Sequence, residues 1–107
     1  MAYSDDLSNL RNRYYNCVNQ LCKTANDLQK SMGAIQHLIN EQKGCYLVDD
    51  VNVGESYLTG LIEKEKGIFN NIVNNILPGT YNIIDNLSLQ ISDAIYQEEL
   101  EAMEVLE

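Results

Sequence analysis

The residues best suited to chemistry gather between Tyr46 and Gly60, in the segment YLVDDVNVGESYLTG. Its two aspartates and its glycines raise the question of an EF-hand calcium loop. Such a loop needs oxygen ligands at positions 1, 3 and 5, glycine at position 6 and glutamate at position 12. With Asp49 at position 1, positions 3 and 5 are valines and position 12 is Gly60; with Asp50 at position 1, Glu55 replaces the required glycine. Neither register can bind calcium, so we predict a turn here and no metal site.

The other candidates for catalysis are His37, which is the only histidine, and three cysteines. A catalytic triad would have to be assembled around His37, and its place in an apolar helical pattern favours a surface or seam position instead. Cys17, Cys22 and Cys45 lack the C-x-x-C spacing of metal or redox pairs. The adjacent aspartates cannot form the facing carboxylates of a glycosidase, and no glycine-rich phosphate loop occurs. We therefore predict no catalytic, metal-binding or cofactor-binding residues and no enzymatic activity.

Charge narrows the choice of partner. The net charge is −9, and no lysine or arginine follows Lys66. A nucleic-acid ligand needs protein cations to neutralise its phosphates, and an anionic membrane surface repels an acidic chain. No apolar run approaches membrane-spanning length, and the first residues lack the basic and apolar regions of a signal peptide. We expect neither nucleic acid nor membrane insertion. We expect a cytoplasmic protein, or one secreted without a signal peptide by a route that accepts folded helices.

The elements that would position these residues are helices. Apolar residues step by three and four from Leu7 onward, which predicts a first helix over about residues 5–43 with Ser4 as its N-cap. In heptad notation, the a positions are Leu7, Tyr14, Leu21, Leu28 and Ile35, and the d positions are Leu10, Cys17, Thr24, Ser31 and Leu38. A second stripe fills the e positions with Val18, Ala25, Met32 and Ile39. We expect the a and d residues to pack within the chain, with Cys17 as a small core residue. We expect the e stripe to be exposed and to bind a second chain. A small bundle that buries both stripes is the simpler alternative.

The second half predicts a returning helix over about residues 53–97. Asn52, followed three residues later by Glu55, resembles a capping box, which makes residues 44–52 the turn and places Gly54 beside it. Pro78-Gly79 either kinks this helix or ends it. With the turn centred near residue 49, the numbers of facing residues should add to about 98, and residues 98–107 form an acidic tail.

The predicted fold is thus all-α, a long antiparallel helix–turn–helix hairpin whose second helix is kinked or broken near Pro78-Gly79. Its expected outward stripe would bind partner helices through five apolar residues: Val18, Met32, Ile39, Phe69 and Val73.

A small acidic helical hairpin of this length resembles the WXG-like proteins of bacterial type VII secretion, and in particular the helical targeting factors found beside LXG toxins. In that family a W-x-G tripeptide precedes the second helix. Here the equivalent place is Asn52-Val53-Gly54, which keeps the glycine and lacks the tryptophan. The resemblance covers nearly the whole chain and depends on architecture. It implies two partners, a second small WXG-like protein and the helical N-terminal domain of a secreted toxin.

The family's export signal, Y-x-x-x-[DE], occurs twice, at Tyr46 to Asp50 and at Tyr81 to Asp85. The first lies in the predicted turn, the wrong end for a signal that follows the second helix. The second lies inside the second helical segment, where Tyr81 could equally be a packing residue, so either this pair is the signal or the chain is the partner that lacks one. The alternative hypothesis is a self-associating structural or adaptor protein, which would form a homodimer unrelated to secretion.

Overall fold

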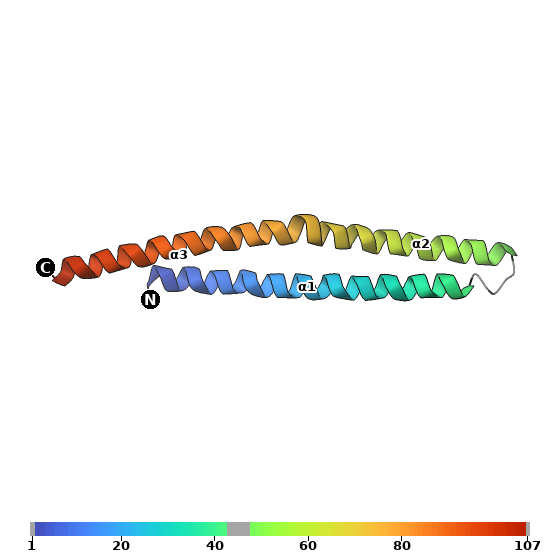
Figure 1. Ribbon diagram of the computed structural model, residues 1–107, viewed down its shortest axis with the longest axis horizontal. Helices are drawn as coiled ribbons and strands as arrows, with labels where there is room; N and C mark the ends of the chain where they lie inside the picture. The colour runs from blue at the N-terminus through green and yellow to red at the C-terminus, as the bar shows by residue number, and fades with distance from the viewer. Residues whose placement is uncertain (1, 43–47, 107) are drawn as a thin grey trace. The chain divides into compact units, whose positions relative to one another are not determined.

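The computed structural model describes residues 2–42 and 48–106, and within these ranges it is helical with no strand (Figure 1). Helix α1 spans Tyr3–Gln42 and helix α2 spans Val48–Asn71. A π-helical turn, η1, spans Ile72–Ile76, and helix α3 follows directly as Leu77–Leu106. The predicted all-α fold is confirmed.

The chain forms two compact units. The terminal unit consists of Met1–Gln20 and Leu77–Glu107, and the central unit consists of Leu21–Ile76. In the terminal unit, Ser4 of α1 bonds to Glu98 of α3 and Arg11 bonds to Ser88, so the two helices run antiparallel.

In the central unit, Ser31 of α1 bonds to Glu65 of α2. The residue numbers of all three bonded pairs add to within a few of the predicted 98, which confirms the hairpin pairing. The sum of 98 places Gly67 opposite Ser31, but Gly67 is exposed, and a Cβ there would meet nothing within 4 Å.

The core of the terminal unit is small. Leu7 of α1 packs with Leu87, Ile91 and Ala94 of α3, and Tyr14 covers the cluster from one side. The α3 members are spaced by four and three residues, so they share one face of the helix. This face sets the orientation of every other side chain on α3.

On α1 the predicted d and e stripes are interchanged, so that the e stripe faces inward and most of the d stripe is exposed. The a positions do turn inward, but their buried companions are e positions: Val18, Ala25 and Ile39 are all buried. Leu10, Cys17 and Leu38, predicted at the inner d positions, are exposed. The physical reason lies in composition, because the middle of the e stripe is valine, alanine and methionine, whereas the middle of the d stripe is cysteine, threonine and serine. Packing the e stripe buries more apolar surface.

The helix ends also differ from the prediction. Helix α1 begins at Tyr3, so Ser4 lies inside the first turn rather than at its cap. Helix α2 begins at Val48 and includes Asn52 and Gly54, so neither belongs to the turn. The remaining part of the predicted turn, residues 44–47, lies outside the described residues.

The predicted acidic tail is helical. Helix α3 continues past residue 97 to Leu106. Residues 98–106 read EELEAMEVL, which contains no glycine or proline and consists mainly of strong helix formers. The sequence therefore offers no stop signal at residue 98.

The interruption predicted near Pro78 takes the form of the π turn. Proline lacks the N–H that would bond to the carbonyl four residues earlier, and its ring collides with that carbonyl in a regular α-helix. Widening the preceding turn, Ile72–Ile76, accommodates the ring while the helical backbone continues into α3. The second helix is interrupted and does not end there.

Candidate partner-binding surfaces

A polar anchor fixes the start of α1 against α3. The Glu98 carboxylate accepts two hydrogen bonds from Ser4, one from the backbone N–H at 3.1 Å and one from the hydroxyl at 2.8 Å. Ser4 is buried, so both donors would be costly to leave without a partner. Seven residues further along α1, the Arg11 guanidinium donates to the Ser88 hydroxyl at 3.1 Å. These contacts fix the register of the terminal unit.

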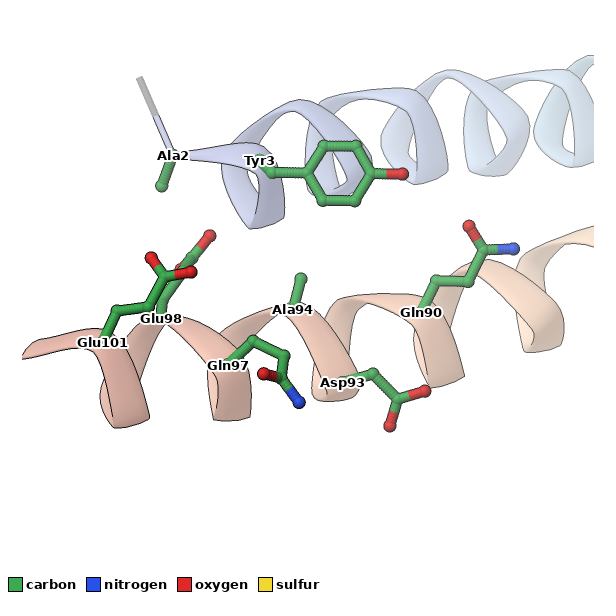
Figure 2. Close-up of a pocket in the computed structure, with 8 residues that line it drawn as sticks. All are labelled: Ala2, Tyr3, Gln90, Asp93, Ala94, Gln97, Glu98 and Glu101. Carbon is green, nitrogen blue, oxygen red and sulfur yellow. The ribbon is translucent and has the colours of Figure 1, made fainter. Parts of the chain in front are cut away.

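A shallow hollow of about 550 Å³ lies beside this anchor, between the start of α1 and α3 (Figure 2). Ala2 and Tyr3 line one side, and residues of α3 between Gln90 and Glu101 line the other. Figure 2 shows the side chains of Ala94 and Glu98 directed towards α1, whereas those of Asp93 and Gln97 turn away from it. The hollow is open to solvent and lacks the enclosure that small-molecule sites provide. It is better regarded as part of a larger surface.

The five residues predicted to bind a partner do not share one outward surface. Val18 and Ile39 are buried within the chain, which corrects their assignment to an outward stripe. Met32 and Phe69 are half-buried, and Val73 in the π turn is 39% exposed. The error has the same origin as the interchange of the d and e stripes on α1. Of the five, Val73 is the one available to another chain.

Tyr81 and Asp85, the candidate export signal, both lie on α3 and are both exposed. They are four residues apart, so they are neighbours on one side of the helix. The alternative of Tyr81 as a core residue does not hold, because Ile84 occupies the buried position of this turn.

Helix α3 carries an apolar stripe that was not predicted from the sequence. Leu89, Tyr96, Leu100 and Met103 are exposed by 67%, 58%, 36% and 61%. Leu89 and Tyr96 each follow a buried residue, Leu87 or Ala94, by two positions, which is about 200° around the helix. The stripe therefore lies on the side of α3 opposite to α1. The signal that could have found it is the seven-residue spacing of Leu89, Tyr96 and Met103.

Acidic side chains border this stripe, which we call the outer α3 stripe. Asp93 and Glu104 lie on one border and Glu99 on the other, and all three are exposed. No salt bridge to these acids is found in the described part of the chain, where His37 and Glu41 form an exposed pair at 2.9 Å on α1. The stripe combines a hydrophobic centre with an anionic rim.

The described residues contain no group of three or more His, Cys, Asp or Glu side chains that could hold a metal ion. No described helix is long and apolar enough to span a bilayer. No family model, curated protein or solved structure matches the chain. The exposed apolar side chains of the helices are therefore the features from which a function can be argued.

Proposed function

We propose that this protein is a non-enzymatic helical adaptor that binds helices of other chains. The observation that carries the proposal is the number of large apolar side chains left exposed on both units. In the terminal unit these include Leu10, Ile83, Leu89, Ile95 and Tyr96, and in the central unit Leu38, Tyr57, Ile68 and Val73. Exposed apolar surface on this scale is typical of protein–protein contacts.

The resemblance to WXG-like targeting factors supplies the identity of the proposed partners. They are a second small helical protein and the helical N-terminal domain of an LXG-type toxin, which the complex presents for type VII secretion. In this proposal Tyr81 and Asp85 serve as the export signal, and their exposure on α3 supports that role. Asn52-Val53-Gly54 lies within α2 and lacks the tryptophan of the family's W-x-G tripeptide.

The test is affinity purification of the tagged protein from its own host, followed by mass spectrometry. We expect a second small helical protein and a larger toxin-like chain to co-purify with the wild type. Val73→Glu should reduce this recovery because it places a charge on an exposed apolar position of the π turn. Asn74→Glu is the matched control, since it adds a charge to the neighbouring exposed residue and removes no apolar surface.

Circular dichroism should give the same helicity for both variants, so that loss of a partner is not loss of the fold. Recovery of the protein alone, as a folded homo-oligomer, would contradict the adaptor proposal and support the self-associating alternative.

A further inference from the structure

We propose that the outer α3 stripe is the docking site for a basic amphipathic helix of a different chain. This inference builds on the adaptor function and adds to it the surface used and the chemistry of the partner. It arises from three properties of α3: the position of the stripe, the charge of its borders and the way the helix ends.

The position of the stripe leaves it without a partner in the terminal unit. The α1-facing side of α3 is occupied by Ile84, Leu87, Ile91 and Ala94, all buried. Leu89, Tyr96 and Met103 recur every seven residues on the opposite side, which is the spacing of one seam position of a coiled coil, and Leu100 adds a neighbouring apolar side chain. From Leu89 to Met103 the stripe is about 21 Å long, enough for a contact of two heptads.

The borders of the stripe determine the charge of the occupant. Asp93 and Glu104 flank the apolar side chains on one border and Glu99 flanks them on the other, as charged residues flank the apolar seam of a coiled coil. Residues in these positions select partners by charge, and no lysine or arginine of α3 is present to mix the signs. A helix with lysine or arginine beside its own apolar seam complements these borders.

The same charges argue against a second copy of this chain. Two outer α3 stripes packed together, parallel or antiparallel, would bring acidic borders against acidic borders. Like charges in such positions oppose association and suppress the wrong pairing. The occupant is therefore a different chain.

The end of α3 provides a further reason for a basic partner. Beyond the Ser4–Glu98 contact, α1 offers no further helical turn, because it begins at Tyr3, whereas α3 continues to Leu106. These last turns carry Glu99, Glu101 and Glu104 at the negative end of the helix dipole, where acidic side chains are unfavourable. Cations of a docked helix would offset that repulsion.

The experiment uses the full-length purified protein and two synthetic three-heptad peptides. Both peptides carry leucine at a and d, but one has lysine at e and g and the other has glutamate. We expect the basic peptide to bind, by fluorescence anisotropy, and to bind more weakly as salt is raised, whereas the acidic peptide should not bind.

The paired variant Leu89→Glu with Tyr96→Glu should weaken binding of the basic peptide by about tenfold or more. Asn12→Glu with Asn19→Glu is the matched control, because it adds the same two charges at exposed residues seven apart on α1 and removes no apolar surface. The charge-reversed variant Asp93→Lys, Glu99→Lys, Glu104→Lys should exchange the preference and bind the acidic peptide.

Three results would overturn the inference: no binding of the basic peptide, equal binding of both peptides, or equal loss with Asn12→Glu and Asn19→Glu. Self-association that Leu89→Glu with Tyr96→Glu abolishes would also overturn it, in favour of a second copy. If partners co-purify from the host but remain bound to that double variant, this surface is wrong while the adaptor function stands. If nothing co-purifies, the adaptor function fails.

Discussion

At the scale of single residues, the contact between Ser4 and Glu98 determines how the terminal unit closes. One carboxylate satisfies both the backbone N–H and the hydroxyl of a buried serine. Such a contact is specific in register because both bonds form only when the first turn of α1 lies beside residue 98. An acidic residue near the end of α3 thus has a structural role, while its neighbour Glu99 is exposed.

Glu98→Ala should lower the free energy of unfolding by about 1–2 kcal/mol, because it leaves the two buried donors of Ser4 without an acceptor. Chemical denaturation followed by circular dichroism measures this change, and hydrogen exchange should show faster opening of the first turn of α1. Glu99→Ala removes an adjacent, exposed carboxylate and should have little effect. Equal destabilisation by the two variants would show that the anchor does not stabilise the fold.

At the scale of elements, the π turn takes up one extra residue in the spacing of inward side chains. Inward residues of α2 and η1 are spaced by four or three positions up to Phe69 and Ile72. The next inward residue is Leu77 of α3, five positions later. The pattern of fours and threes then resumes through Ile84 and Leu87. One extra residue in a regular α-helix would rotate everything after it by about 100°. The π turn absorbs that residue.

If the π turn takes up an extra residue, two single-residue deletions should differ in their effect on stability. Both are made together with Pro78→Ala. Deleting Asn74 removes the extra residue, so α2 and α3 should join in one continuous α-helix. The stability of the protein should be unchanged or higher. Deleting Gln90, an exposed residue of α3, puts Ile91 and Ala94 out of phase with Leu87 and should cost at least about 2 kcal/mol. Urea denaturation compares both with Pro78→Ala alone. Similar losses for the two deletions would contradict the role given to the π turn.

Periodicity was sufficient to predict the all-α hairpin, the pairing register and the interruption near Pro78. It did not decide which stripe of α1 turns inward, because both stripes border the same a positions and the difference between them lies in their composition, not in their spacing. It also misplaced the start of α1, since the bond from Ser4 to Glu98 joins residues far apart in the sequence. The outer α3 stripe was missed because the inward face of the same helix dominates the pattern. The seven-residue spacing of the outer α3 stripe can be recognised only after the inward residues of α3 have been assigned to the contact with α1.

At the scale of the whole molecule, repulsion among acidic side chains opposes the stabilisation that a small apolar core provides. The net charge is −9, and among the described residues no large side chain is completely shielded from solvent. Self-repulsion destabilises a compact state, and dissolved salt screens it. The protein should therefore be more stable in salt than in dilute buffer.

We expect the melting temperature, followed by circular dichroism, to rise when sodium chloride is increased from 10 to 300 mM. The variant Asp93→Lys, Glu99→Lys, Glu104→Lys is the control, since each change adds two positive charges and brings the net charge from −9 to −3. Its melting temperature should depend much less on salt. A wild-type melting temperature that is constant or falls with salt would exclude self-repulsion as a limit on stability.

The exposure of Cys17 and Cys22 has a practical consequence for mapping these contacts. They are five positions apart on α1, an axial rise of about 7.5 Å, so the geometry of a regular helix keeps them from forming a disulfide with one another. They also point about 140° apart, which gives the native chain two thiols on different sides of one helix. A thiol-specific spin label or photocrosslinker can therefore be attached to either side after replacing the other two cysteines, Cys45 among them, with serine. The protection of each thiol in a complex then reports which side of α1 a bound chain covers.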